Sequence, residues 1–477
     1  MNQYRREVLW IILALWAGFS ALSLLFPGGG KRGAMGLSFY NFSELWKFAS
    51  NKPEDAARTD SLIKYYTEKA NLGEYNHSDS LLPFPEIDLA RKGFLNAEIP
   101  SELLPFFRAL DSVSGNNGIK IAHYGDSQIE GDRITAHLRK LFQANFGGRG
   151  IGYIPLADPA SVWAYQRSGS ANWKRHSVFQ NKLSEGLYGV SGTAYRFART
   201  EIRDSISPDS ISVRVIEGNR ANLKFNFTHV TSFEPVKLAY AMPQSPTQVV
   251  VKTSDTSRTK INLDGNKRWN ELTLPMLGAS SKLELEFEGE KSPILYGLYM
   301  EGKGGIQVDN YAIRGHAGEG LLQIPVDILA EQANQQNIKL FIFQYGNNAI
   351  PYLDSIGECK AFEEVYYRLF SRFRQTVPGA SILVIGVGDM LTRVQGQDVT
   401  WPLLIEFRNA QKRAALRAGC AFWDLFEAMG GERSLLAWNE KKLAAKDGHL
   451  SPSGQQLIAA KIHEDIMAAY IRYRNNK

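Results

Sequence analysis

The spacing of hydrophobic residues predicts an α/β domain built from two separate parts of the chain. In the first part, an alternating strand at residues 119–124 is followed by a helical pattern at 134–146. Nearer the C-terminus, apolar strands at 339–343 and 381–385 alternate with helical patterns, the last of which runs from 452 to 473. Because strands that alternate with helices usually form a parallel sheet, we expect one such sheet with helices on both faces.

The stretch between residues 150 and 297 has a different pattern. It is rich in Ser, Thr, Asn and aromatic residues, and its apolar positions alternate in short runs at 212–215, 223–227, 248–252 and 282–287. Turn-forming pairs such as Asp264-Gly265 separate the runs. Short strands of this kind are typical of a β-sandwich or jelly roll. We therefore expect a β module inserted into the α/β domain.

The N-terminal region carries one long apolar segment. Residues 8–26 contain no charged side chain, and roughly 20 apolar residues in a helix span the hydrocarbon core of a membrane. Arg5 and Arg6 precede this segment, which favours a cytoplasmic amino terminus. The alternative is a cleaved signal peptide, but its apolar core would be shorter, so we favour an uncleaved signal anchor in the inner membrane. In either case we expect the rest of the chain to be periplasmic or otherwise extracytoplasmic.

These patterns together predict the domain organisation. Residues 1–34 form the signal anchor, and residues 35–99 form a membrane-proximal spacer. Residues 100–150 and 301–477 form the two parts of the α/β domain, and residues 151–300 form the inserted β-sandwich.

Composition and charge exclude several other classes of protein. Of the 477 residues, 44% are hydrophobic and 22% are charged, as is ordinary for a folded protein. The net charge of +6 is spread along the chain without a basic patch, so we expect no nucleic-acid partner. The two cysteines, Cys359 and Cys420, are too few for a disulfide scaffold, and we expect them to be unpaired. The histidines lack the spacing of metal ligands, so we predict no metal.

Four short motifs lie where an open parallel sheet binds its ligands, at the carboxyl ends of strands. In chain order they are Gly125-Asp126-Ser127-Gln128, Gly315, Gly346-Asn347-Asn348 and, before the last helix, Asp447-Gly448-His449. Each motif alone is weak, since Gly-Asn-Asn, for example, is more often a plain turn. Because all four occur in this order and lie at strand ends or before a helix, the set is much stronger evidence for a functional site than any one motif.

The residue types in these motifs suit nucleophilic catalysis. A serine hydroxyl becomes a good nucleophile when a base takes its proton, and the base needs an acidic partner that orients it. Asp447 and His449, two residues apart on one loop, can supply both. Ser127 lies on a turn between a strand and a helix, where backbone N–H groups favour a developing oxyanion.

The four motifs resemble the sequence blocks of the SGNH, or GDSL, hydrolase superfamily. The resemblance covers about residues 100–150 and 300–475, and it implies a flavodoxin-like three-layer α/β/α fold with esterase chemistry and no cofactor. It also implies that Ser127 is the nucleophile, that His449 is the general base and that Asp447 orients His449. The oxyanion donors would be the backbone N–H groups of Ser127 and Gly315 and the side chain of Asn348.

Two positions depart from the usual pattern of this superfamily. Gln128 stands where the first block commonly has leucine, and Ala349 stands where an aspartate commonly follows the third-block asparagine. Neither position carries the proton transfer, so these departures bear on substrate preference. Gln128, His316 and Asn347 adjoin the motif residues and are further candidates for contact with the substrate.

An exported member with a β-sandwich between the first and second blocks resembles bacterial polysaccharide O-acetylesterases, including those that act on peptidoglycan. The expected function is therefore removal of acetyl groups from an O-acetylated polysaccharide outside the cytoplasmic membrane. An O-acetyltransferase would use the same residues, with a sugar hydroxyl in place of water. A non-catalytic wall-binding protein is a third class, against which the complete set of Ser127, Asp447 and His449 argues. Three aromatic residues of the β module are candidates for stacking on sugars: Trp163, Trp173 and Tyr188.

Overall fold

The computed structural model describes residues 93–158, 160–197, 201–207, 210–215, 219–228, 235–253, 257–275 and 281–477. The expected signal anchor, including the apolar segment at 8–26, lies outside the described residues, as does most of the expected spacer. Within the described part of the chain, no helix is both long enough and apolar enough to cross a membrane.

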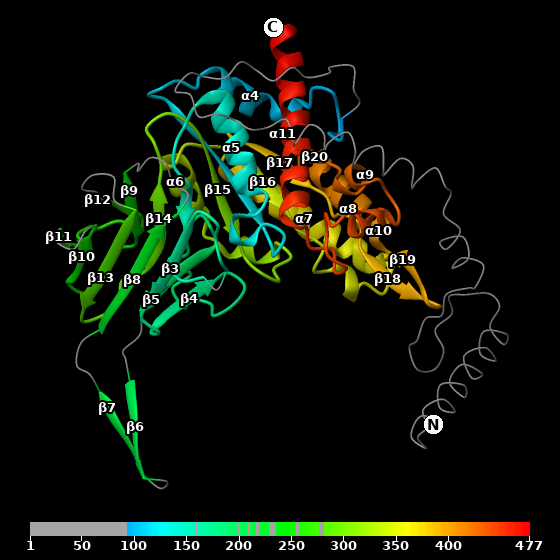
Figure 1. Cartoon of the computed structure of the whole chain (residues 1–477). Coiled ribbons are helices and arrows are strands. Elements are labelled where there is room, and N and C mark those ends of the chain that lie inside the picture. The colour runs from blue at the N-terminus through cyan, green and yellow to red at the C-terminus, as the bar shows by residue number, and fades with distance from the viewer. Residues whose placement is uncertain are drawn as a thin grey trace, which may run out of the picture.

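A parallel sheet of five strands forms the centre of the α/β domain (Figure 1). Its strands are β1 (Gly118–Gly125), β15 (Gly305–Ala312), β16 (Ile338–Gln344), β17 (Ser381–Ile385) and β20 (Ala421–Trp423). They lie in the order β15-β1-β16-β17-β20, and every neighbouring pair is parallel. When the five strands are numbered in chain order, this is 2-1-3-4-5, which is the flavodoxin-like order. The expected parallel α/β sheet is therefore confirmed.

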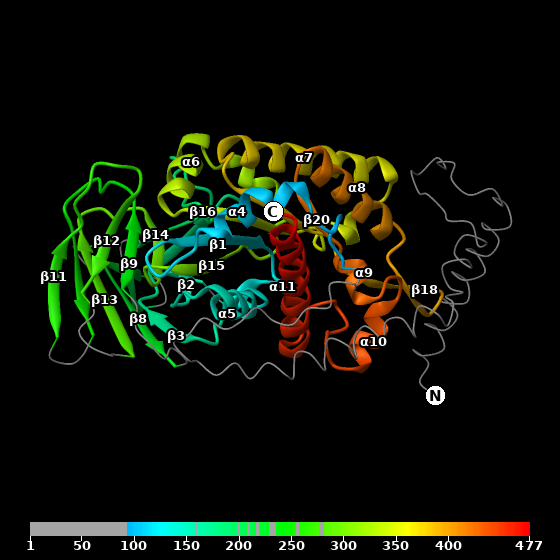
Figure 2. The same cartoon turned by 90° about the horizontal axis from the view of Figure 1, so that it is seen from above.

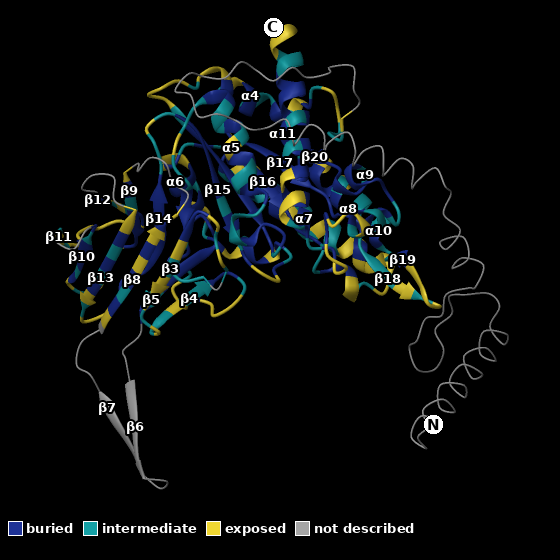
Figure 3. Ribbon diagram, viewed as in Figure 1, coloured by how far each residue is buried: buried dark blue, intermediate teal, exposed yellow. Residues whose placement is uncertain are grey.

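Helices cover both faces of this sheet (Figure 2). One face packs against α5 (Thr135–Phe146) and α11 (Pro452–Asn475), and the other against α6 (Val326–Gln335), α7 (Ile356–Thr376) and α8 (Leu404–Arg417). Because successive side chains of a strand point to opposite faces, β1 contributes to both cores. Its Ile119 and Ile121 pack in the core beneath α5 and α11, and Ala122 and Tyr124 pack in the core beneath α6, α7 and α8. The strands are accordingly buried in Figure 3.

Shorter elements complete the α/β domain. The one-turn helices are η1 (Ser101–Leu103), η2 (Glu130–Asp132), η3 (Glu319–Gln323) and η4 (Ile350–Tyr352). The short α-helices are α4 (Leu104–Asp111), α9 (Leu425–Met429) and α10 (Ser434–Glu440). An antiparallel hairpin joins β18 (Leu391–Val394) to β19 (Gln397–Thr400).

The residues just before position 100 pack against one edge of the parallel sheet. Leu95 forms an antiparallel bridge with Trp423 of β20, and the N–H of Asn96 donates to the carbonyl of Phe422 at 3.0 Å. These contacts cover an edge strand whose backbone groups would otherwise be open to another chain. Residues 93–99, which we expected in the spacer, therefore pack as part of the α/β domain.

Two antiparallel sheets form the β module between β1 and β15. One sheet has the order β11-β10-β13-β8-β3, and the other has the order β12-β9-β14-β5-β4 with β2 paired to β14. The side chains between the sheets, among them Phe225, Leu238 and Phe287, form a core of their own, as expected for a sandwich. The strands of the module are β2 (Gly152–Ile154), β3 (Tyr165–Gly169), β4 (Trp173–Ser177), β5 (Thr193–Phe197), β8 (Asn219–Phe227), β9 (Val236–Tyr240), β10 (Thr247–Lys252), β11 (Arg258–Asn262), β12 (Asn270–Leu274), β13 (Lys282–Gly289) and β14 (Leu295–Met300), with β6 (Glu201–Ser207) and β7 (Ser210–Val215) as a separate antiparallel pair.

The three aromatic residues considered for sugar stacking differ in exposure. Trp173 packs edge-on against Phe287 in the sandwich, with 5.5 Å between the ring centroids. Tyr188 is buried, and its hydroxyl accepts a hydrogen bond from the N–H of Leu183 at 2.8 Å. Trp163 is 73% exposed. Of the three, only Trp163 presents its ring to solvent.

Candidate active site

The four sequence motifs meet at the carboxyl end of the parallel sheet. Ser127 follows β1, Gly315 follows β15 and Asn348 follows β16, and β1 lies between the other two strands. The reversal of strand order on either side of β1 leaves a crevice at its carboxyl end, which is where such sheets bind ligands. The loop that carries Asp447 and His449 reaches the same place from the segment between α10 and α11.

Ser127, His449 and Asp447 form an unbroken line of polar contacts. The Oγ atom of Ser127 lies 2.8 Å from Nε2 of His449, and Nδ1 of His449 lies 3.1 Å from Oδ2 of Asp447. Ser127 is half-buried, whereas the side chains of His449 and Asp447 are 39% and 69% exposed. Partial burial opposes the ionisation of Asp447, but the backbone N–H and the ring of His449 outweigh it, and the pKa of Asp447 is lowered. A serine nucleophile, its base and an orienting carboxylate would require contacts of this kind.

The loop that carries His449 is held by its own backbone and by the first motif. The N–H of Ala445 donates to the carbonyl of His449 at 2.7 Å, and Gly448 has a φ of +84°, which a residue with a side chain rarely adopts. The side-chain amide of Gln128 donates to the carbonyl of Gly448 at 3.1 Å. The Gln128 side chain is buried and faces this loop. We expected Gln128 to contact the substrate, which stays a prediction; in the structure its side-chain amide contacts the loop that carries His449.

The three expected oxyanion donors lie around Ser127. Among the described residues, no protein group accepts a hydrogen bond from the backbone N–H of Ser127 or of Gly315. The turn at Gly315 has a φ of +73°, which favours glycine. The side-chain amide of Asn348 donates to Oδ2 of Asp126 at 2.8 Å and to the carbonyl of His316 at 3.4 Å. An oxyanion would take the place of this second, longer contact.

Asp126 orients two of the residues that surround the site. It is buried, its Oδ1 accepts the N–H of Gln128 at 2.9 Å, and its Oδ2 accepts the amide of Asn348. Burial raises the pKa of Asp126 to about 6, although these hydrogen bonds and the charge of His449 oppose the shift. Asp126 therefore acts on the site by holding Asn348 in place.

His316 and Asn347, the other expected substrate contacts, have different positions. His316 is fully buried, and its Nε2 accepts the N–H of Gly320 at 2.9 Å. Burial lowers the pKa of His316 to about 4, so the ring is neutral at pH 7. The structure thus places His316 beneath the site and out of reach of a bound substrate. Asn347 is half-buried beside Asn348.

Arg314 and Glu130 fix the turn that carries Gly315. The Arg314 guanidinium donates to both oxygens of the Glu130 carboxylate, with Nη2 at 2.6 Å from Oε2. The Glu130 side chain is only 6% exposed, whereas Arg314 is 62% exposed. This pair ties the segment after Ser127 to the residue before Gly315.

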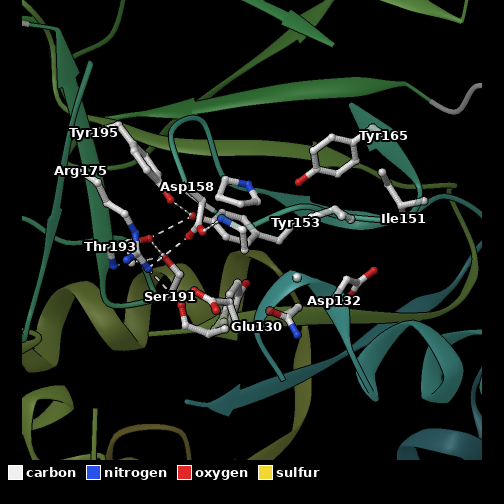
Figure 4. A pocket seen from close by; sticks show the side chains of 17 residues that line it. Glu130, Asp132, Ile151, Tyr153, Asp158, Tyr165, Arg175, Ser191, Thr193 and Tyr195 are labelled. Carbon is white, nitrogen blue, oxygen red and sulfur yellow. Dashed lines mark hydrogen bonds and ion pairs between the residues drawn. The ribbon is translucent and has the colours of Figure 1, made fainter. Parts of the chain in front are cut away.

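A cleft runs along the junction between the β module and the α/β domain (Figure 4). Its charged groups are largely paired, since Glu130 binds Arg314 and Arg175 lies 3.5 Å from Asp158. Ser127 and His449 are not among the residues that line it. The cleft therefore combines paired charged groups with apolar side chains such as Ile151 and Val162, and it lies apart from Ser127 and His449. In the described part of the chain, no three His, Cys, Asp or Glu side chains are grouped as metal ligands would be, and both cysteines are buried free thiols.

Comparison with solved structures identifies the fold. A peptidoglycan O-acetylesterase aligns over 80% of this chain and 100% of its own, with a TM-score of 0.62 and 21% sequence identity. The chain therefore shares the fold of this esterase. A family two carbohydrate esterase from Clostridium thermocellum in complex with cellohexaose is 12% identical over 56% of this chain and 98% of its own, with a TM-score of 0.24. No family model and no curated protein sequence matches the chain.

The order of the parallel strands explains how residues far apart in the sequence meet. Ser127 and Asn348 end neighbouring parallel strands, so the register of β1 and β16 brings their motifs together. The β module enters between the first and second motifs, after α5, and returns to the sheet at β15. Its insertion therefore leaves the order of the parallel strands unchanged.

Proposed function

We propose that this protein is a serine esterase that removes O-acetyl groups from a polysaccharide. The observation that carries the proposal is the unbroken line from Ser127 through His449 to Asp447, together with the backbone N–H groups of Ser127 and Gly315, for which the described residues provide no acceptor. Such an arrangement supplies a nucleophile, a base and an oxyanion site within one crevice.

The reaction follows from this geometry in two halves. Ser127 Oγ attacks the acetyl carbonyl carbon while His449 Nε2 takes the hydroxyl proton, and the carbonyl oxygen becomes an oxyanion held by Ser127, Gly315 and Asn348. When the bond to the sugar oxygen breaks, His449 returns the proton to that oxygen and acetyl-Ser127 remains. Water then attacks the acetyl group, with His449 again as base, and acetate leaves. Asp447 stabilises the imidazolium that forms in each half.

The proposed substrate is an O-acetylated polysaccharide outside the cytoplasmic membrane, and peptidoglycan is the first polymer to test. The fold shared with a peptidoglycan O-acetylesterase supports this choice. The uncharged segment at residues 8–26 supports an anchor in the inner membrane, with the catalytic part on the extracytoplasmic side.

Acetate release tests the proposal. Purified full-length protein would be incubated with O-acetylated peptidoglycan, acetylated xylan and a series of nitrophenyl esters, beside Ser127→Ala. Ser112→Ala is a matched control, because Ser112 is an exposed serine at the end of α4. We expect acetate from at least one polymer with wild type and Ser112→Ala, and none above background with Ser127→Ala. Acetyl transfer to added sugar acceptors without acetate release would contradict an esterase and indicate a transferase.

A further inference from the structure

A turn of the β module packs directly beside the oxyanion site. It joins β4 to the segment before β5, and the hydroxyl of Ser177 fixes it by accepting the N–H groups of Phe179 and Gln180 at 3.2 and 2.8 Å. The carbonyl of Val178 in this turn accepts the side-chain amide of Gln323 in η3 at 3.1 Å. The turn is therefore rigid and is docked on the segment that follows Gly315.

Phe179 is the residue that this turn brings to Gly315. A Cβ atom added to Gly315 would lie 3.7 Å from Cε1 of Phe179, and no other described group, apart from its chain neighbours, would come within 4 Å. That distance would be ordinary van der Waals contact for the added atom, so the ring edge faces Gly315, whose N–H is an expected oxyanion donor, across a space about the size of one methyl group. Phe179 remains half-buried, with part of its ring accessible.

His316 and Tyr345 support the Phe179 ring from beneath. The centroids of the Phe179 and His316 rings are 5.3 Å apart at an interplanar angle of 36°, and Tyr345 meets the other side of His316 edge-on at 5.4 Å. His316 is fully buried and Tyr345 nearly so. In this column of three rings, Phe179 is the outermost member and faces the space beside Gly315.

We propose that Phe179 is a specificity-determining residue that closes the acyl side of the site and restricts the enzyme to short acyl groups. A carbonyl oxygen bound to the oxyanion donors lies about 3 Å from the Gly315 N–H. The acyl chain begins one bond from that carbonyl carbon, so a chain that extends toward Gly315 meets the ring after one or two carbons. The β module thus supplies part of the esterase site. This inference rests on the proposed esterase function.

Replacement of Phe179 should widen the range of acyl groups. One methylene in a hydrophobic pocket changes kcat/KM by roughly 10–200-fold. We expect Phe179→Ala to raise the ratio of kcat/KM for nitrophenyl butyrate to that for nitrophenyl acetate at least about tenfold over wild type. Phe179→Leu keeps an apolar side chain of intermediate size and should give an intermediate ratio.

The experiment measures kcat/KM for acetyl, butyryl and hexanoyl esters with the full-length wild type, both Phe179 variants and Met242→Ala. Met242 is an exposed apolar residue of the same module to which no role in the site is assigned, so its removal should leave the acyl profile unchanged. Thermal unfolding checks that each variant is folded. If Phe179→Ala does not fold, the comparison is made with Phe179→Leu alone.

Two results would overturn the inference in distinguishable ways. If wild type hydrolyses esters in a Ser127-dependent manner but folded Phe179 variants keep the wild-type butyrate-to-acetate ratio, Phe179 does not set the acyl length and the esterase function stands. If wild type and Ser127→Ala are equally inactive on every ester, the proposed function fails and the inference fails with it.

Discussion

Asp447→Asn tests how strongly an exposed carboxylate assists His449. The two groups are 3.1 Å apart, and at that distance two unit charges attract by about 1 kcal/mol in water and about 5 kcal/mol at an effective dielectric of 20. The Asp447 side chain is 69% exposed, which places the contribution near the lower value. Loss of the preferred imidazole orientation adds to this charge effect. We therefore expect kcat/KM to fall about 10–100-fold, well short of the roughly ten-thousandfold loss for a buried triad aspartate.

The assay is hydrolysis of nitrophenyl acetate by purified variants at low and high ionic strength. Salt screens an exposed ion pair, so the gap between wild type and Asp447→Asn should narrow at about 1 M salt. Asp398→Asn is the matched control, because Asp398 is an exposed aspartate 3.5 Å from Arg393 in the β18–β19 hairpin. A variant as inactive as Ser127→Ala would refute the reasoning from exposure, and a variant with wild-type activity would refute the orienting role itself.

Two further predictions concern Asn348 and a buried carboxylate. Asn348→Ala should lower kcat by about 100–1,000-fold, or about 2.7–4 kcal/mol, with an unchanged fold by circular dichroism; full activity would contradict its role as an oxyanion donor. Burial raises the pKa of Asp389 to about 7, although hydrogen bonds from the Thr400 hydroxyl and the Leu435 N–H oppose this shift. The charged form of Asp389 therefore destabilises the native state. The free energy of unfolding of Asp389→Asn minus that of wild type should therefore rise by about 4 kcal/mol between about pH 4 and 8. This rise is added to a pH-independent cost, because the amide NH2 group of Asn cannot accept one of these two hydrogen bonds. Denaturant unfolding at pH 5 and 8 measures this difference, and a difference independent of pH would contradict the shifted pKa.

The sequence was sufficient for the elements whose pattern is local. The alternating pattern at 119–124 located β1, although its polar members Lys120 and His123 are also buried, because β1 is packed on both faces. The helical pattern at 134–146 matches α5 closely. The four motifs could also be found, since each follows a strand or precedes a helix within a few residues. Parallel pairing then brings them together without further information.

The contacts that depend on tertiary docking could not be predicted in this way. Phe179 lies in a turn of the β module with no periodic signal, and only the docking of that turn on Gln323 places it near Gly315. His316 follows Gly315 and was expected at the substrate, but the reversal of the chain there turns it inward toward Gly320. Gln128 was likewise expected to contact the substrate because it adjoins Ser127, and the sequence did not reveal its contact with the carbonyl of Gly448.

The measurement that tests the central claim most directly is trapping of the acyl-enzyme. Full-length protein would be mixed with nitrophenyl acetate, quenched in acid at short times, digested and analysed by mass spectrometry. The account predicts an acetyl group on Ser127 that appears before acetate and decays as acetate is released, and that is absent from Ser127→Ala. Acetate release with the acetyl group on a residue other than Ser127, or a burst of nitrophenol with no acetylated Ser127 peptide, would contradict Ser127 as the nucleophile.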